Sequence, residues 1–310
     1  MKMWEKWEKP FLRTSGAVLL LGMLGSGPRP AEAAQLEVNT SSPHLCAVVE
    51  GGKTANGTPV IAYSCSGGPA DQWNMVNSQL QGIGTANGKS MCLNVSGTTT
   101  GSPVNLYACN GGKNQQWVFS FGRIFGVQSA LCLDSSGGPA SGGGTQLVVN
   151  ECSDATSQNW ILRAVQLQLN SSAPYMCVAV SGGDTAPGTP VLSYSCGDSP
   201  QQVWNFTGSK ETNQLGQFQG IGTENGESTC LTLSGMTAGS LVNLSPCTTS
   251  SEATWTIING TGFGLPASNL ILSAVAELCL DSSGGPAVGG GRQLVANNCD
   301  GKASQNWDIR

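Results

Sequence analysis

Residues 134–148 read DSSGGPASGGGTQLV, and residues 281–295 read DSSGGPAVGGGRQLV. A second match precedes this one in both halves of the chain: GIGTANGKSMCL at 82–93 and GIGTENGESTCL at 220–231. The first pair is offset by 147 residues and the second by 138, so small insertions separate otherwise parallel blocks. Self-similarity of this kind indicates that the chain contains a duplication.

The cysteines and tryptophans divide each copy into three smaller units. The chain has 12 Cys, and successive pairs are separated by 19, 17 and 20 residues, after which the same three spacings repeat. One tryptophan follows the second cysteine of every pair by eight residues: Trp73, Trp117, Trp160, Trp204, Trp255 and Trp307. We therefore expect six homologous units, three in each of two domains.

The composition favours an all-β fold. Gly supplies 43 of the 310 residues and charged residues supply 11%, whereas globular proteins average about 7% Gly and about 25% charged residues. This composition disfavours long helices and coiled coils. Between residues 104 and 108, Val104 and Leu106 alternate with Asn105 and Tyr107, which is the period of a half-buried strand. Clusters of Gly, Ser, Thr and Pro supply frequent turns.

The first 33 residues have the features of a secretory signal peptide. Basic residues between Lys2 and Arg13 precede an apolar stretch at 16–25, and Ala31 and Ala33 provide the small residues that signal peptidase reads. The apolar stretch is shorter than the about 20 residues that a spanning helix needs, and a retained anchor is the alternative. An even number of cysteines also indicates an oxidising compartment. We expect a secreted, extracellular or periplasmic protein with domains at 35–163 and 164–310.

Charge and ligand content argue against several classes of protein. Without residues 1–33, nine Lys/Arg stand against sixteen Asp/Glu, a net charge of −7. An acidic chain without basic clusters lacks the footprint of a nucleic-acid-binding protein. His44 is the only histidine and no Cys-x-x-Cys occurs, so no metal and no cofactor are expected. Since no catalytic motif is present either, we expect no enzymatic activity and, after residue 33, no membrane span.

Each unit ends in a recurring motif. The motif is Gln-x-Trp at 115–117, 158–160, 202–204 and 305–307. It is replaced by Asp-Gln-Trp at 71–73 and by Ala-Thr-Trp at 253–255. Together with Cys-Leu-Asp at 132–134 and 279–281, this pattern resembles the ricin B-type lectin family over nearly all of the chain after residue 33. The resemblance implies two tandem β-trefoil domains, each of three disulfide-stapled repeats, with sugars bound in shallow pockets of individual repeats.

The resemblance also implies roles for the tryptophans and cysteines. The six Trp are expected in the core, where each would bury about 150–250 Å². The cysteines are expected to pair within units, as Cys46–Cys65, Cys92–Cys109, Cys132–Cys152, Cys177–Cys196, Cys230–Cys247 and Cys279–Cys299. Free or cross-paired cysteines are the alternative. Closing a loop of about 18 residues in this way contributes about 3 kcal/mol in the chain-entropy account.

A working pocket in the resembled family needs residues at four positions. They are an Asp two residues after the first Cys, a polar residue four before and an aromatic two before the second Cys, and an Asn three before the Trp. A carboxylate accepts bonds from adjacent sugar hydroxyls, an amide both donates and accepts, and a ring covers the C–H face of the sugar. On extended strands the residues flanking the cysteines at this spacing share one face.

No unit carries the whole set, and three units are candidates for carbohydrate binding. The third unit offers Asp134, Asn150 and Gln158, and the sixth offers Asp281, Asn297 and Gln305. The second offers Asn94, Asn105, Tyr107, Asn114 and Gln115, with Asn in place of the Asp. The other three lack the acid, and Tyr63 and Tyr194 are expected to be surface packing. The alternative for the two acids is that each caps the polar turn after it.

These features predict a non-enzymatic lectin that binds sugar weakly and multivalently through a minority of its six repeats. The expected partners are glycans, either galactose-type sugars or plant or cell-wall polysaccharide. A protein-binding or inhibitory scaffold whose sugar pockets have decayed is the alternative, because a fold alone does not determine function.

Overall fold

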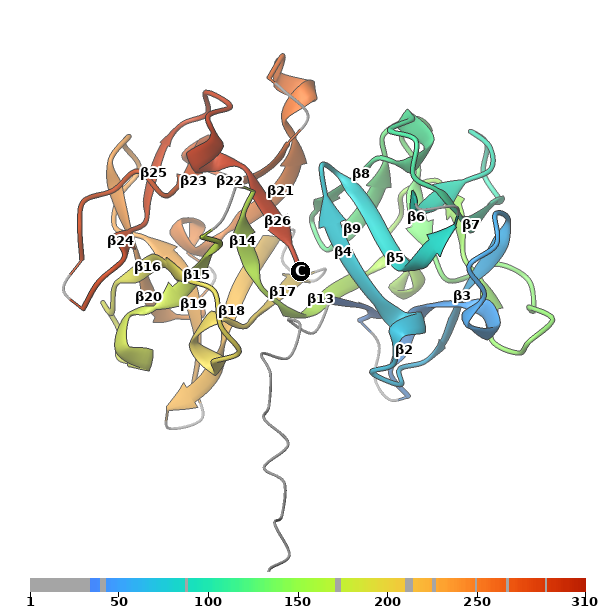
Figure 1. The fold of residues 1–310 in the computed structure, drawn as a ribbon, viewed down its shortest axis with the longest axis horizontal. Helices are drawn as coiled ribbons and strands as arrows, with labels where there is room; N and C mark the ends of the chain where they lie inside the picture. The colour runs from blue at the N-terminus through green and yellow to red at the C-terminus, as the bar shows by residue number, and fades with distance from the viewer. Residues whose placement is uncertain are drawn as a thin grey trace, which may run out of the picture.

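The computed structural model describes residues 34–39, 43–86, 89–170, 174–209, 214–224, 227–248, 250–265, 268–287 and 289–310. The expected signal peptide, residues 1–33, lies outside this part of the chain. The protein is all-β and consists of two tandem β-trefoil domains, visible in Figure 1 as two lobes of strands. The described residues contain no α-helix, and none of their helical turns could cross a membrane.

Each lobe is built from three consecutive units of short strands and single 3-10 turns. The first lobe comprises β1 (Ala34–Val38), β2 (Leu45–Val49), η1 (Glu50–Gly52), β3 (Thr58–Ser64), η2 (Pro69–Asp71), β4 (Gln72–Val76), β5 (Gln79–Ala86), β6 (Lys89–Val95), β7 (Ser102–Ala108), η3 (Lys113–Gln115), β8 (Trp117–Ser120), β9 (Arg123–Gly126), β10 (Cys132–Asp134), β11 (Thr145–Gln146), β12 (Val148–Asn150), η4 (Thr156–Gln158) and β13 (Trp160–Val165). The second comprises β14 (Leu167–Leu169), β15 (Met176–Val180), η5 (Ser181–Gly183), β16 (Val191–Ser195), η6 (Pro200–Gln202), β17 (Trp204–Ser209), β18 (Gln214–Glu224), β19 (Glu227–Leu233), β20 (Ser240–Pro246), η7 (Ser251–Ala253), β21 (Trp255–Asn259), η8 (Gly260–Phe263), β22 (Asn269–Ser273), β23 (Leu278–Asp281), β24 (Arg292–Gln293), β25 (Val295–Asn298), η9 (Ala303–Gln305) and β26 (Trp307–Ile309).

The strands of each lobe close into a barrel. The last strand of the third unit returns to the first strand of the first unit, through β13 with β1 in one lobe and β26 with β14 in the other. The middle strands of each unit form a hairpin, such as β6 with β7, and these hairpins pair with one another at β3–β7 and β7–β12. Closure pairs the edges of the sheet and leaves a shared interior for the large side chains.

That interior holds the six tryptophans. Each is 0–1% exposed, which confirms the prediction that they form the core. Every indole Nε1–H donates to the backbone carbonyl that follows the first cysteine of its own unit, at 2.8–3.1 Å. A buried indole needs such a partner. The constant spacing of Trp and Cys along the chain thus corresponds to one repeated contact between the end of a unit and its hairpin.

The twelve cysteines form six disulfides, each within one unit. The pairs are Cys46–Cys65, Cys92–Cys109, Cys132–Cys152, Cys177–Cys196, Cys230–Cys247 and Cys279–Cys299. Each staples the two strands of a hairpin, or one strand and the loop that follows the hairpin. The predicted strand at 104–108 is β7, in which Val104 and Leu106 are buried and Tyr107 is exposed.

The two lobes pack through homologous strands. Leu162 of β13 pairs with Phe206 of β17, and Met75 of β4 pairs with Ile309 of β26. These contacts are equivalent, because Ile309 is the counterpart of Leu162 and Phe206 is the counterpart of Met75 at the repeat offsets. A third pairing joins Phe119 of β8 to its own counterpart, Ile257 of β21. The lobes are therefore related by an approximate two-fold axis near Phe119, as in an isologous dimer.

Candidate functional site

The glutamine of the Gln-x-Trp motif is buried under each candidate site and hydrogen-bonded to the backbone of its own unit. In the four units that have it, the side chain is only 0–2% exposed. Its Oε1 accepts from the backbone N–H five residues earlier at 2.7–2.9 Å, and its Nε2 donates to the carbonyl seven residues earlier at 2.7–3.0 Å. Gln115, Gln158 and Gln305, which we expected among the sugar-binding residues, are thus too deeply buried to touch a ligand directly.

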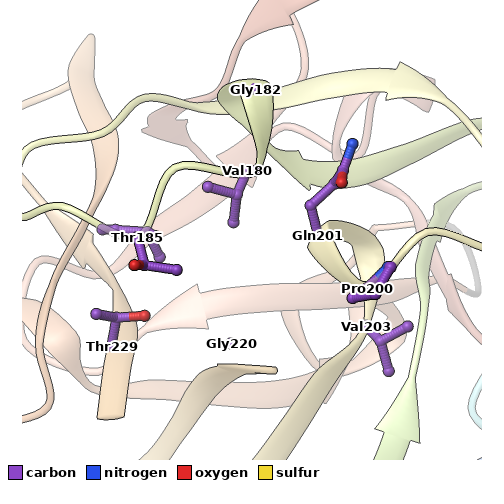
Figure 2. A pocket seen from close by; sticks show the side chains of 10 residues that line it. Val180, Gly182, Thr185, Pro200, Gln201, Val203, Gly220 and Thr229 are labelled. Carbon is purple, nitrogen blue, oxygen red and sulfur yellow. The ribbon is translucent and has the colours of Figure 1, made fainter. Parts of the chain in front are cut away.

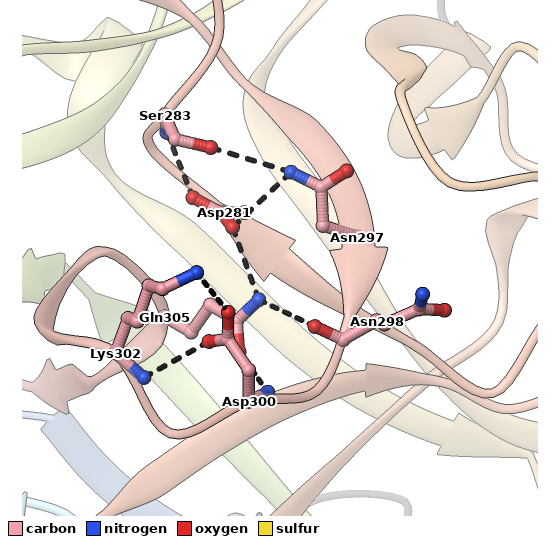
Figure 3. Close-up of polar contacts among 7 residues, drawn as sticks. All are labelled: Asp281, Ser283, Asn297, Asn298, Asp300, Lys302 and Gln305. Atoms are coloured by element: carbon pink, nitrogen blue, oxygen red, sulfur yellow. Dashed lines mark hydrogen bonds and ion pairs between the residues drawn. The ribbon is translucent and has the colours of Figure 1, made fainter.

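Asp281 is the centre of the polar cluster in the sixth unit (Figure 3). Its Oδ1 accepts from the backbone N–H of Ser283 at 2.8 Å, the turn-capping bond that sequence analysis gave as the alternative role. Its Oδ2 accepts from Asn297 at 3.2 Å and from Gln305 at 3.0 Å. Asn297 also donates to the Ser283 hydroxyl at 3.3 Å. The capping bond and the polar cluster therefore coexist on one carboxylate.

The third unit repeats this arrangement around Asp134. Oδ1 accepts from the backbone N–H of Ser136 at 2.8 Å, and Oδ2 accepts from Asn150 at 3.0 Å and Gln158 at 2.8 Å. Asn150 also donates to the Ser136 hydroxyl at 3.2 Å, and its Oδ1 accepts from the Gly101 N–H at 3.0 Å. The structure therefore brings together all three residues expected at this site, and all three of their counterparts in the sixth unit.

Both carboxylates are held in the charged form. Burial, the largest single influence, raises the pKa of Asp134, but hydrogen bonds from Gln158, Ser136, Asn150 and Ser157 together outweigh it and lower the pKa below the ordinary 3.8. The pKa of Asp281 is lowered in the same way, with Ser283 and Gln305 as the main donors opposing burial. Each cluster is thus a fixed negative charge at neutral pH with little solvent around it.

Solvent reaches these two clusters from the side of the amide and hydroxyl groups. Asp134 and Asp281 are each 3% exposed, whereas Asn150 and Asn297 are half-buried and Ser136 and Ser283 are exposed. The aromatic position holds Asn in both units, so neither cluster has a ring. The outer surface of each cluster presents amide and hydroxyl groups, with the carboxylate behind them.

The second unit combines an amide cluster with an exposed ring. Asn94 donates to Asn105 at 3.0 Å and accepts from Asn114 at 2.7 Å, and Gln115 approaches it at 3.4 Å. Tyr107 is 41% exposed and lies opposite Cys92 in the ladder, next to the Asn94–Asn105 pair. The four predicted amide residues of this unit are joined by hydrogen bonds, Tyr107 lies two positions along the same strand from Asn105, and the cluster is uncharged.

The first and fourth units differ in a way that sequence analysis did not anticipate. In the first, Glu50 accepts from the Ser141 hydroxyl at 2.9 Å and the Gly142 N–H at 2.7 Å, which ties the 140–144 loop down beside Tyr63. Ser181 occupies the corresponding position of the fourth unit. There, a hollow of about 280 Å³ is lined by Ala179, Val180, Ser181, Gly182, Leu192, Tyr194, Gln201 and Gly289. Tyr194, expected to be surface packing, therefore lines an open hollow.

Groups suited to other chemistry are sparse in the described residues. His44 lies beside Glu37, with 2.5 Å between Nδ1 and Oε1, and Glu37 also forms an ion pair with Arg163 that joins β1 to β13. Within this part of the chain no three His, Cys, Asp or Glu side chains gather closely enough to hold a metal ion.

Comparison with known proteins gives one clear result. The family model described as ricin-type beta-trefoil lectin domain matches residues 34–160 and 165–307. No curated protein sequence matches the chain.

Several solved structures are similar to the chain at low sequence identity. The agglutinin from Abrus precatorius is 18% identical, with a TM-score of 0.35 over 90% of this chain and 97% of that chain. A non-toxic homologue of type II RIPs from Momordica charantia, solved with α-methyl-D-galactoside, is 20% identical, with a TM-score of 0.36 over 90% and 97%. The haemolytic lectin CEL-III is 20% identical, with a TM-score of 0.34 over 90% and 64%. Identities and TM-scores this low do not assign a function. Membership of a family is therefore shown by the family model.

Proposed function

The chain belongs to the ricin-type β-trefoil lectin family, and from this premise we propose that it binds carbohydrate through the clusters around Asp134 and Asp281, with the Asn94–Tyr107 cluster as a third site. The expected ligands are galactose-type sugars or plant or cell-wall polysaccharide. The polar groups at all three sites are oriented by the fold before any ligand arrives, which lowers the entropic cost of binding.

One observation carries the proposal: the same four-residue cluster of acid, amide, glutamine and serine is built twice, in the third and sixth units, with matching bonds. A structural cap needs only the bond from the serine N–H to the acid. The additional amide, Asn150 or Asn297, donates both of its hydrogens within the cluster, to the acid and to the serine hydroxyl, which leaves the amide oxygen and the serine hydroxyl at the surface beside an ionised carboxylate. That combination suits the paired hydroxyls of a sugar.

Binding at each site is proposed to be weak and to gain strength from multiplicity. Without a ring at Asp134 and Asp281, and without a charge at Asn94, each site should bind near a millimolar Kd, about −4 kcal/mol. Because the two lobes are joined by paired strands, the sites keep fixed positions, and a polymer can engage several at once. A free monosaccharide and its polymer binding equally well would argue against this part.

Secretion and the domain limits also belong to the proposal. Six disulfides suit an oxidising, extracellular or periplasmic location, and residues 1–33 are proposed as the signal peptide. The proposed domain limits are 35–163 and 164–310. This limit falls inside β13, at Ala164, where the backbone turns left-handed with φ 55°.

The test is a glycan array probed with wild type and two double variants, Asp134→Asn/Asp281→Asn and Asn94→Ala/Tyr107→Ala. Asp300→Asn is the matched control, because Asp300 lies beside the sixth-unit cluster but pairs with Lys302. We expect the wild type and the control to bind the same glycans and the first double variant to lose most of the signal. Binding unchanged in both double variants would contradict the proposed sites.

A second candidate function is a protein-binding scaffold. The 3% exposure of both acids favours it, because a carboxylate satisfied from within contributes less to a ligand. Failure of the wild-type protein to bind any glycan on the array would support the scaffold and exclude the lectin.

A further inference from the structure

A cavity in the second lobe lies beside the Tyr194 hollow and outside the three proposed sites. Its volume is about 340 Å³, within the range of small-molecule sites. Figure 2 shows Val180 above the cavity, Thr185 and Thr229 on its left, Gly220 below it, and Gln201, Pro200 and Val203 on its right. The walls come from β15, η5 and η6 of the fourth unit and from β18, β19 and β20 of the fifth.

One wall of the cavity carries a smaller side chain than the equivalent position of the first lobe. At the repeat offsets, the counterpart of Thr229 is Met91, which is 0% exposed and part of the first lobe's core. The space next to the tryptophan differs as well. A methyl group on Gly82 would come within 2.8 Å of the Trp73 ring, whereas one on Gly220 would stay 3.7 Å from the Trp204 ring.

The walls are suited to an uncharged, apolar group. Val180, Val203, Pro200 and Leu244 supply hydrocarbon surface, and none of the lining residues described is ionisable. Val180 is 7% exposed here, whereas its counterpart Val49 is 0% exposed in the first lobe. An apolar group entering the cavity would therefore remove apolar surface of both partners from water.

The cavity and the Tyr194 hollow adjoin. Both are lined by Val180, Gly182 and Gln201. In the hollow, Tyr194 is 41% exposed, so its ring is available to stack on a sugar, and Ala179 stands where an acid would be. A ligand that fills both spaces has a polar ring at one end and an apolar group at the other.

We propose that the fourth unit binds glycosides that carry an apolar aglycone, with the sugar ring against Tyr194 and the aglycone in the cavity between Val180 and Thr229. This inference rests on the proposed lectin function and gives it a ligand class. The aglycone supplies the affinity that the missing acid cannot, so this site selects aryl or alkyl glycosides over free sugars.

The experiment compares matched ligands by calorimetry: methyl and phenyl β-D-galactoside, and the corresponding pair of glucosides. For wild type we expect the phenyl glycoside to bind about tenfold more tightly than the methyl glycoside, because its ring is buried. Thr229→Met restores the residue of the first lobe and should bring the ratio to about one. Val203→Gln, which also copies the first lobe (Gln72), serves as a second variant if the first does not fold.

Thr237→Met is the control, because Thr237 is exposed and outside the cavity, and it should keep the wild-type ratio. Equal affinity for phenyl and methyl glycosides in wild type overturns the inference while leaving the lectin function intact. A preference that survives both Thr229→Met and Val203→Gln also overturns it. If neither glycoside nor any polysaccharide binds, the proposed function fails and the inference fails with it.

Discussion

Asp281 and Asp134 are buried to the same degree and yet kept ionised. Each has three oriented donors from within its own unit, including the serine N–H two residues later. Such a carboxylate is both part of the fold's internal bonding and a charge behind the binding surface. Its removal should therefore affect stability as well as ligand binding.

Asp281→Asn should destabilise the second lobe by about 1–3 kcal/mol, because the new amide group opposes the donors of Asn297 or Gln305 and leaves one of them unsatisfied. Asp134→Asn should do the same in the first lobe. The measurement is urea unfolding at pH 7, with Asp300→Asn as the control that changes the midpoint little. A midpoint equal to wild type would show that the observed bonds do not contribute.

The pH dependence of stability has a definite sign. Since the folded pKa of Asp134 and Asp281 lies below the ordinary 3.8, the two carboxylates contribute stability that is complete above about pH 4 and is lost as the pH falls through the folded pKa. The difference in unfolding free energy between wild type and Asp134→Asn/Asp281→Asn should be constant from pH 7 to 5 and shrink below pH 4. A difference that grows on acidification would contradict this account.

At the scale of the residue, the sequence predicted which side chains lie close together but not how deeply each is buried. The spacing from the cysteines places Asp281, Asn297 and Gln305 near one another, and the structure brings them together. Spacing cannot show that Gln305 is 0% exposed, because the depth of a side chain depends on which loop covers it. The motif glutamine is therefore better described as the support of the acid than as a ligand residue.

At the scale of the element, the hairpin with its disulfide is the unit that forms a site. In the second unit, the Cys92–Cys109 bond holds β6 against β7, and the register places Asn94 opposite Asn105. The fifth unit has the same loop length between Cys230 and Cys247 but lacks the amide cluster. This pair of hairpins allows stability and binding to be separated.

Cys92→Ser/Cys109→Ser and Cys230→Ser/Cys247→Ser should each cost about 3 kcal/mol, since both open a loop of 17 residues. Only the first should weaken any binding that depends on Asn94 and Tyr107. Thermal unfolding and glycan binding of both variants check this. Equal losses of binding in the two variants would show that the hairpin acts only through global stability.

Loops account for most of what could not be predicted at this scale. The strands could be predicted from the alternation of apolar and polar residues, and the tryptophan contacts from the constant spacing of Cys and Trp. Both patterns are local and recur in the repeats. The two hydrogen bonds that Glu50 accepts from Ser141 and Gly142 join residues about ninety positions apart. The cavity at Thr229 depends on the space left around a tryptophan. The repeat pattern of the sequence indicates neither the Glu50 bonds nor the cavity.

At the scale of the whole molecule, the lobes form one structure through polar as well as apolar contacts. Asn269 of the second lobe is 0% exposed, accepts from the Ser78 N–H at 2.5 Å and donates to the Met75 carbonyl at 2.9 Å. Phe119 and Phe206 meet edge to face, with ring centroids 6.5 Å apart. This interface holds the binding sites at fixed separations.

We expect the chain to unfold in a single calorimetric transition, because loss of one lobe exposes the paired strands and rings of the other. Asn269→Ala should leave the buried Ser78 N–H unsatisfied and cost about 1–3 kcal/mol while keeping one transition. Two well-separated transitions in wild type would show that the lobes are independent and would remove the structural basis for fixed spacing.

The most direct measurement is a titration of ¹⁵N-labelled protein with the glycan that binds best on the array, following the side-chain amide signals of asparagine. We expect the signals of Asn150 and Asn297 to shift saturably, and the shifts to be absent in Asp134→Asn/Asp281→Asn. A glycan that binds while every amide of these clusters and of the Asn94 cluster stays unmoved would contradict it.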